Sequence, residues 1–126
     1  MSSNEVLKLI KEKEIESVDL RFTDPRGKLQ HLTMDATCVD DEMLNDGVFF
    51  DGSSISGWKA INESDMILKP DLSRKIIDPF TSHNTLILFC DILDAVKKNS
   101  YERDPRGIAK KAEAYLKKTG VGDKAY

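Results

Sequence analysis

The sequence predicts an α+β fold, because helical patterns lie at both ends of the chain and strand patterns lie between them. Ser2 and Glu5 have the spacing of a capping box, and apolar residues then recur with the helical period to about Glu14. Between residues 18 and 23, apolar and polar residues alternate strictly, which is typical of a half-buried strand. Residues 85–92 form a nearly continuous apolar run, which indicates a central strand buried on both faces.

Composition and charge exclude several classes of protein. The chain has 126 residues, of which 40% are hydrophobic, enough for one small core but not for two. Its 19 basic and 22 acidic residues give a net charge of −3, whereas a binder of the nucleic-acid backbone normally carries a cationic excess. No apolar run approaches the roughly 18 residues that span a bilayer, and the N-terminus lacks a signal-peptide pattern. We therefore expect a cytoplasmic protein with neither a nucleic-acid nor a membrane partner.

The two cysteines, Cys38 and Cys90, are isolated in the sequence, without a CxxC pair or a neighbouring histidine. Cys90 lies inside the apolar run, where a buried, reduced thiol is the ordinary interpretation. We expect no disulfide and no zinc site.

A β-hairpin is expected between residues 18 and 34. Asp24, Pro25 and Gly27 occupy the first, second and last positions of a type I turn, and residues 28–34 return as an antiparallel strand. A short helix follows at residues 40–47, with acidic residues in its first turn and Gly47 at its left-handed end. The last two strands before the apolar run are short, and each ends near a proline; they lie at residues 66–68 and 76–77.

The C-terminal third begins with a polar, linker-like stretch at residues 97–103. Asp104 then supplies an N-cap and Pro105 the first helical position, and the predicted helix runs to Thr119, with Gly120 as its stop. The tetrapeptide Asp-Pro-Arg-Gly occurs at residues 24–27 and again at residues 104–107. The first copy joins strands and the second begins a helix, so we do not interpret the pair as a repeat.

A Gly/Ser-rich loop with one carboxylate at its entrance, residues 51–57, is the most informative segment. A nucleophilic serine would need a Gly-x-Ser-x-Gly elbow, and a phosphate cradle would need a Gly-Lys-Ser/Thr ending; both are missing. Two further interpretations are that the loop presents Asp51 to a cationic ligand or partner, or that it only closes a hairpin while Asp51 accepts backbone hydrogen bonds. The residues alone leave these alternatives open.

The same loop carries a resemblance to a known family. The chain resembles the N-terminal signature of bacterial type I glutamine synthetase in the segments Phe50-Asp51-Gly52-Ser53-Ser54-Ile55, Gly57-Trp58-Lys59, Ile61-Asn62-Glu63-Ser64-Asp65-Met66 and Pro70-Asp71. Further similar segments, in the same order along the chain as in the family, are Val18–Asp24, Ile77–Phe80, Cys90–Ile92 and Arg103–Arg106.

The resemblance implies a β-grasp fold, which is a mixed sheet with a helix packed across one face, plus a C-terminal linker helix. It divides the chain into an N-terminal helix (1–15), the β-grasp domain (16–98), and a linker with the start of an absent catalytic domain (99–126). That larger domain would carry the metal ligands and the ATP and glutamate sites. The fragment by itself is therefore expected to bind no cofactor or metal and to be inactive.

The resemblance also implies the activity of the complete enzyme. Glutamine biosynthesis by this family is an ATP-dependent ligation of ammonia to glutamate through a γ-glutamyl phosphate, with Mg²⁺ or Mn²⁺. The subunits form a homo-oligomer, expected to be a dodecamer, in which each active site lies between the catalytic domain of one subunit and the N-terminal domain of its neighbour.

Site residues follow from the resemblance, position by position. Asp51 corresponds to the catalytic and substrate-binding aspartate of the ammonium site, and Ser54 to a nearby loop serine that helps to close it. Asp65 matches the family pattern as a weaker candidate that holds the subunit contact, tunes the ammonium pocket or is purely structural. Trp58 is interpreted as a loop anchor. His31 and His83 are interpreted as surface or hairpin residues without a metal role.

Two alternatives remain. A stand-alone, ubiquitin-like β-grasp module that binds a protein partner without catalysis has the same mixture of helices and strands. A family member that acts on another amine in place of ammonia is also compatible with the sequence.

Overall fold

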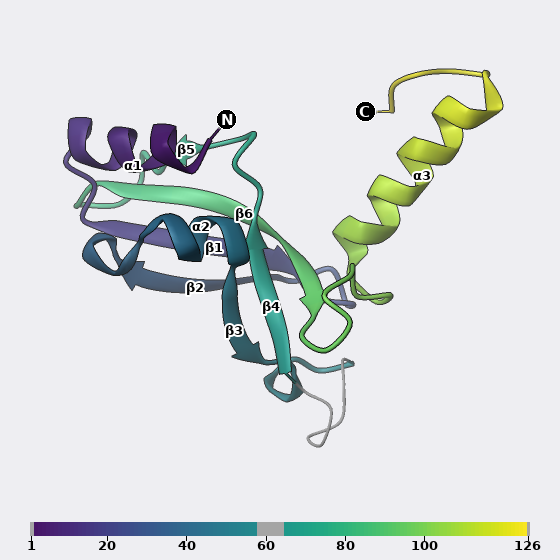
Figure 1. Ribbon diagram of the computed structural model, residues 1–126, viewed down its shortest axis with the longest axis horizontal. Coiled ribbons are helices and arrows are strands. Elements are labelled where there is room, and N and C mark those ends of the chain that lie inside the picture. Colours follow the sequence, from purple (N-terminus) through teal and green to yellow (C-terminus); the bar gives the residue numbers. More distant parts are fainter. Residues whose placement is uncertain (1, 58–64, 126) are drawn as a thin grey trace.

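The sheet is built around its longest strand, β6, in the computed structural model, which describes residues 2–57 and 65–125 (Figure 1). The predicted α+β class is confirmed. The elements in chain order are α1 (Ser3–Glu12), β1 (Ser17–Thr23), β2 (Leu29–Asp35), η1 (Ala36–Cys38), α2 (Asp41–Asp46), β3 (Val48–Asp51), η2 (Gly52–Ser54), β4 (Asp65–Pro70), β5 (Ile76–Ile77), β6 (Thr85–Asp94) and α3 (Pro105–Thr119).

The strand order is β2-β1-β6-β4-β3, with β5 paired to β6 beside this path. β1 runs parallel to β6, whereas the β1–β2, β3–β4, β4–β6 and β5–β6 pairs are antiparallel, so the sheet is mixed. β4 and β5 both pair with β6 but at different positions along it, since β4 pairs with residues 90–94 and β5 with residues 86–87. The central position predicted for residues 85–92 is confirmed.

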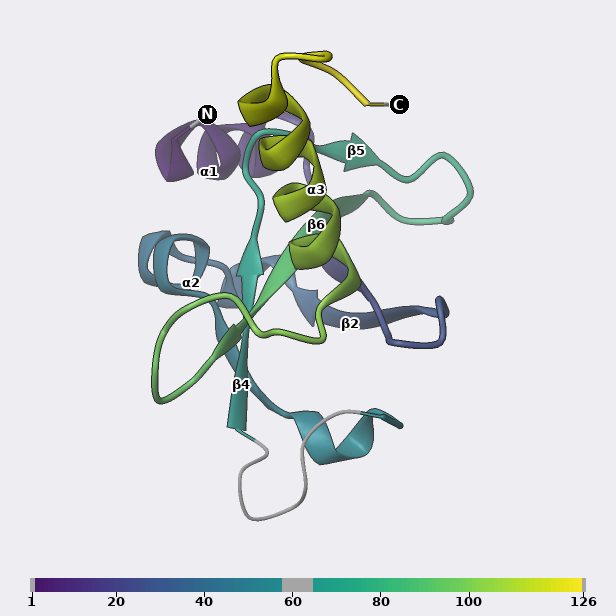
Figure 2. The ribbon, with the colours of Figure 1, turned by 90° about the vertical axis from the view of Figure 1, so that its right-hand side faces the viewer.

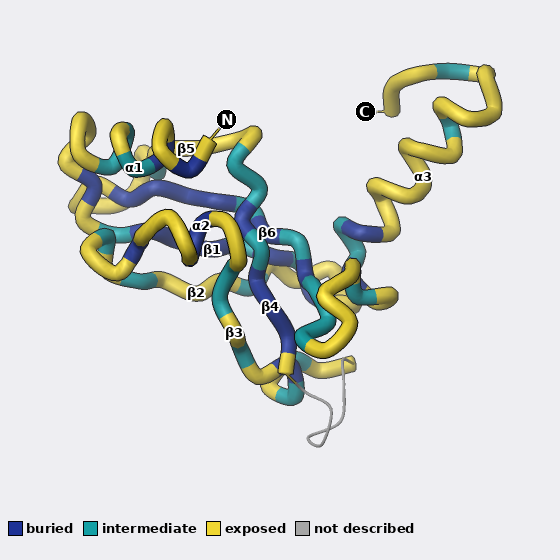
Figure 3. Tube along the Cα trace, in the orientation of Figure 1, coloured by how far each residue is buried: buried dark blue, intermediate teal, exposed yellow. Residues whose placement is uncertain are grey.

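One face of the sheet carries α1 and α2 and holds the core (Figures 1 and 2). Alternate residues of β1 and β6 point into this core, and the rings of Phe22 and Phe50 lie 5.6 Å apart between centroids. Nearly all of the fully buried side chains are aliphatic, and the buried stretches follow β1, β4 and β6 (Figure 3). The core cluster includes Val6, Val18, Leu20, Leu44, Met66, Leu68, Leu86, Leu88, Cys90 and Ile92.

Local sequence signals place the element ends within about two residues of the prediction, although α1 ends at Glu12 and not at about Glu14. The carboxylate of Glu5 accepts a hydrogen bond of 2.9 Å from the backbone N–H of Ser2, which forms the capping box of α1. Gly47 ends α2 with φ 88°, and a Cβ at this position would lie 2.5 Å from the carbonyl oxygen of Leu68. Only glycine therefore lets α2 return directly into β3.

The β1–β2 turn also follows its sequence signature. The N–H of Gly27 donates to the carbonyl of Asp24 at 3.0 Å, and Gly27 has φ 83°. The Asp24 carboxylate is itself buried and accepts hydrogen bonds from the N–H groups of Arg26 and Lys28, both at 2.9 Å. These bonds make the turn a rigid corner of the sheet.

The burial of Asp19 differs from the prediction, because the alternation predicted a strand with its polar residues exposed. It points to the face opposite the core, yet it is only 4% exposed. Its carboxylate accepts hydrogen bonds from Arg21 Nε at 2.7 Å, from Thr33 Oγ1 at 2.8 Å and, in the matching tautomer, from His31 Nδ1 at 2.8 Å. Burial alone would raise the pKa of Asp19, but these hydrogen bonds outweigh it and hold the pKa below its ordinary value.

The stretch before α3 is less linker-like than its composition suggests. Tyr101 donates its N–H to the carbonyl of Ile92 at 2.9 Å, so the chain turns back along the end of β6. Asp104 is fully buried; it caps α3 through Arg106 N–H and also accepts from the N–H of Ile92, both at 3.1 Å. Burial raises the pKa of the Asp104 carboxyl. The segment is thus pinned to the central strand.

α3 leaves the sheet at a steep angle, and ion pairs connect its first two turns to the sheet (Figures 1 and 3). Arg106 pairs with Asp71 and, through Nε at 2.8 Å, with Asp91; Lys110 also pairs with Asp91. Beyond this network the helix is mostly exposed, including Tyr115 at 69%. None of the helices within residues 2–57 and 65–125 is long and apolar enough to cross a bilayer.

Burial predicts a difference in reactivity between the two thiols. Cys90 is buried, which raises its pKa to about 12, whereas Cys38 is exposed. Because the thiolate is the reactive form, iodoacetamide at neutral pH should modify Cys38 and leave Cys90 unmodified until the protein is unfolded in urea. Peptide mass spectrometry measures both, with Cys38→Ser as the control. Equal labelling of the two thiols in the folded protein would contradict the buried position of Cys90.

The Asp19 cluster predicts a pH-dependent contribution to stability. A carboxyl whose pKa is lowered by folding stabilises the protein above its ordinary pKa, and this contribution is lost as the pH falls through the lowered value. Asp19→Asn should therefore reduce the free energy of unfolding at pH 7 by about 1–3 kcal/mol, and by less below pH about 4. Urea unfolding at both pH values measures the difference. The idea fails if the loss is the same at both pH values, or if Asp46→Asn at the exposed end of α2 causes as large a loss.

Candidate functional site

Two carboxylates stand opposite each other at one end of the sheet. Asp51 is the last residue of β3 and Asp65 the first of β4, and they are direct partners in the antiparallel register. Both residues are exposed, and β3 is an edge strand. Like charges placed opposite each other repel, so this pairing lowers the stability of the β3–β4 ladder. An arrangement that costs stability but concentrates negative charge is suited to attract a cation.

Asp51 is oriented by the loop that follows it. Its Oδ1 accepts hydrogen bonds from the backbone N–H of Ser53 at 2.9 Å and from Ser53 Oγ at 2.7 Å, which makes Asp51 the N-cap of η2. Gly52 is buried beneath this turn, and Ile55 packs against the core cluster. The carboxylate is therefore held at the surface by its own loop and is not drawn into the core.

Of the other predicted loop residues, the structure describes Ser54 but not Trp58. Ser54 is exposed at the end of η2, beside Ser53. Trp58, interpreted above as a loop anchor, lies outside the described residues. Ser53 was not singled out by the sequence, although the Asp-x-Ser spacing of an Asx turn is the signal that identifies it.

Gly57, at the end of the loop farthest from Asp51, lies close to two other parts of the chain. The carbonyl oxygen of Gly57 accepts a hydrogen bond of 3.1 Å from Arg103, in the segment before α3. Gly57 has φ 91°, and a Cβ here would lie 3.6 Å from the ring of Pro25, in the β1–β2 turn. The loop, the turn and the start of α3 therefore converge at one place.

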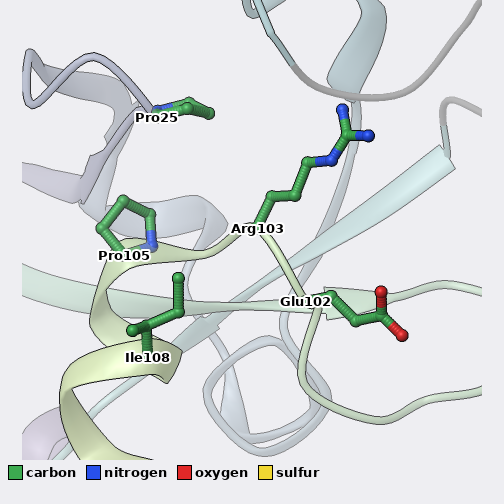
Figure 4. Close-up of a pocket in the computed structure, with 5 residues that line it drawn as sticks. All are labelled: Pro25, Glu102, Arg103, Pro105 and Ile108. Carbon is green, nitrogen blue, oxygen red and sulfur yellow. The ribbon is translucent and has the colours of Figure 1, made fainter.

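An open hollow of about 410 Å³ lies next to this convergence (Figure 4). Pro25 lies on one side of it, and Pro105 and Ile108 at the start of α3 lie on another. The two Asp-Pro-Arg-Gly segments thus meet in space, although one forms a turn and the other begins a helix. Glu102 and Arg103 complete the lining. The hollow is open to solvent.

Within residues 51–57, no serine is hydrogen-bonded to a histidine that could act as its base. Ser53 donates its hydroxyl to Asp51, and His31 contacts Asp19 and Thr33, on β1 and β2. Among the part of the chain that the structure describes, no group of three or more His, Cys, Asp or Glu side chains could hold a metal ion. Attraction of a cation by Asp51 and Asp65 is the chemistry that the arrangement supports best.

Comparisons with known proteins point in one direction. The family model described as glutamine synthetase, beta-Grasp domain, matches residues 14–95. The chain is 63% identical over 125 residues to a glutamine synthetase of Rhizobium meliloti. The alignment covers 99% of this chain and 27% of the relative. A glutamine synthetase of Escherichia coli K12 is 54% identical over 123 residues, or 98% of this chain and 26% of the relative. The chain thus spans about a quarter of the length of the curated relatives it matches.

Solved structures share the fold. A glutamine synthetase of Plasmodium falciparum superposes with a TM-score of 0.85 at 26% identity, covering 95% of this chain and 23% of that one. A protein named GmaS, solved without ligand, superposes with a TM-score of 0.77 over 87% of this chain and 25% of its own, at 23% identity.

The carboxylate pair predicts that Asp65→Asn stabilises the fold. Removing one of two opposed charges should raise the free energy of unfolding by about 0.2–1 kcal/mol at low ionic strength. The gain should shrink at 1 M salt, because exposed charges are then screened. Urea unfolding at the two salt concentrations measures it, with Asp46→Asn as the matched control on α2. A gain that salt does not change would rule out charge repulsion as its cause.

Proposed function

The chain belongs to the glutamine synthetase family, whose β-grasp domain it contains, and from this membership we propose that it works in an ATP-dependent ligase that joins ammonia to glutamate. The observation that carries the proposal is the position of Asp51, which is exposed on an edge strand within the family signature and opposite a second carboxylate. In this proposal the loop at residues 51–57 supplies the ammonium site of a neighbouring subunit.

The proposed role of Asp51 is electrostatic before it is catalytic. Ammonium must leave water, and a carboxylate at the mouth of a closed site offsets part of that cost. The nitrogen must then lose a proton before it attacks the acyl carbon of γ-glutamyl phosphate and displaces phosphate. An ordinary aspartate, with a pKa near 3.9, is a weak base. Asp51 therefore concentrates and orients the cation at least as much as it accepts the proton.

Ser53, Ser54 and Asp65 have supporting roles in the same proposal. Ser53 binds Oδ1 of Asp51 through two hydrogen bonds and thereby orients the carboxylate. Ser54 lies at the exposed end of the same turn and helps to close the site when a neighbouring subunit covers it. Asp65 adds negative charge from the facing strand.

The remaining functions are proposed for the parts of the protein that this stretch does not include. Within the described residues, no group of three or more His, Cys, Asp or Glu side chains could hold Mg²⁺ or Mn²⁺. We assign ATP and these metal ions to a catalytic domain that follows the β-grasp domain (16–98) and the linker helix (99–126), in a cytoplasmic homo-oligomer, a dodecamer by family resemblance. Residues 1–126 alone are expected to be inactive.

A stand-alone, ubiquitin-like interaction module is the competing proposal. Identity to glutamine synthetases over 99% of the chain supports the ligase over the module. A docking module also has no need for opposed carboxylates on an edge strand, since they weaken the ladder.

The proposal predicts how Asp51 variants change the kinetics of the full-length enzyme. Asp51→Asn keeps an acceptor for Ser53 but removes the charge, so the KM for ammonium should rise at least about tenfold and kcat should fall. Asp51→Ala removes the charge and the acceptor, and its effect should be at least as large. Steady-state rates at varied ammonium, with glutamate and ATP saturating, measure both parameters.

The matched control is Asp46→Asn, which removes an equivalent charge from the exposed end of α2. Its KM for ammonium should stay within about twofold of the wild-type value, because an exposed charge outside the site is screened. Near-normal ammonium kinetics for Asp51→Asn would refute the proposed role of this carboxylate.

A further inference from the structure

Arg103 lies between two residues that are fixed to the central strand. Before it, Tyr101 donates its backbone N–H to the carbonyl of Ile92 at 2.9 Å. After it, Asp104 is fully buried and accepts from the N–H of the same Ile92 at 3.1 Å. The backbone of Arg103 is thus clamped on both sides to one residue of β6, although its own side chain is exposed.

The first turn of α3 adds to this clamp. Arg106 pairs with Asp91, the neighbour of Ile92 on β6, and with Asp71, which follows β4. Both strands that flank the clamp are therefore tied to the same helical turn. The side chain of Arg103 extends from a rigid base, away from Pro105 and Ile108 (Figure 4).

The exposed guanidinium of Arg103 reaches a residue 46 positions away and donates to the carbonyl oxygen of Gly57 at 3.1 Å. Gly57 also lies against Pro25, whose turn is held by the buried Asp24 carboxylate. The hydrogen bond from this cationic donor restricts the position of the Gly57 carbonyl. This contact fixes the end of the loop opposite to the end that carries Asp51.

We propose that Arg103 is a positioning residue for the Asp51 loop, so that it sets the affinity of the ammonium site without touching the substrate; this rests on the function proposed above. The loop is held at one end by β3 and the Asp51–Ser53 hydrogen bonds and at the other end by Arg103. When the second end is released, the loop samples more conformations, and Asp51 occupies its productive position for a smaller fraction of the time. The apparent affinity for ammonium falls in proportion to the fraction of time that Asp51 spends in this position.

The test uses the full-length enzyme with Arg103→Gln, Arg103→Lys and, as the matched control, Arg74→Gln on the exposed segment between β4 and β5. Arg103→Gln should raise the KM for ammonium by about three- to tenfold, since it removes a charge-assisted hydrogen bond. The KM values for glutamate and ATP and the thermal midpoint should not change. Arg103→Lys keeps a cationic donor and should restore part of the loss, whereas Arg74→Gln should have no effect.

A double-mutant cycle separates positioning from direct action. If Arg103 acts through Asp51, then Arg103→Gln should have no further effect on the KM for ammonium in an Asp51→Asn background. Additive effects of the two substitutions, or a change in the KM for glutamate or ATP in place of ammonium, would overturn the proposal.

The kinetics of the two variants distinguish an incorrect role for Arg103 from an incorrect role for Asp51. If Asp51→Asn raises the KM for ammonium while Arg103→Gln leaves it unchanged, the ammonium site stands and the positioning role is wrong. If Asp51→Asn itself has no effect, the proposed function falls and the positioning role falls with it.

Discussion

Burial of β6 on both faces, with partners along both of its edges, is the constraint on which the rest of this structure depends. β1 pairs with one edge of its first half, and β4 and β5 divide the opposite edge between them. Every buried backbone group on such a strand must find a hydrogen-bond partner, because an unpaired one is costly. Beyond Phe89, where the ladder with β1 ends, the side chain of Asp104 supplies one such partner, to the N–H of Ile92.

This use of Asp104 connects the core to the surface loop. A single buried carboxylate caps α3 and also accepts from β6, so the direction of the helix is set by the central strand. Arg103 precedes that carboxylate and contacts Gly57. The position of the loop is thus determined by the packing of the core through a short chain of hydrogen bonds. Rigid support of this kind is what a binding site on a loop requires.

The carboxylates of the candidate site differ in their surroundings from the buried carboxylate of Asp19. Asp51 and Asp65 oppose each other on an edge strand, whereas the buried Asp19 is surrounded by donors. The first arrangement places two acidic residues opposite each other at the surface, whereas the second surrounds one carboxylate with donors inside the fold. Carboxylates in one small domain therefore have different roles, which their neighbours decide.

The sequence by itself determined the fold class, the element ends and the family signature around Asp51. These predictions succeeded because caps and turns depend on residues a few positions apart, as with Glu5 and Ser2 or Gly27 and Asp24. Only the tertiary structure decided that Asp19 is buried and that Asp65 faces Asp51, because strand register follows from the packing of the entire sheet. The contact between Arg103 and Gly57 joins residues 46 positions apart, and no local pattern encodes a hydrogen bond over that separation.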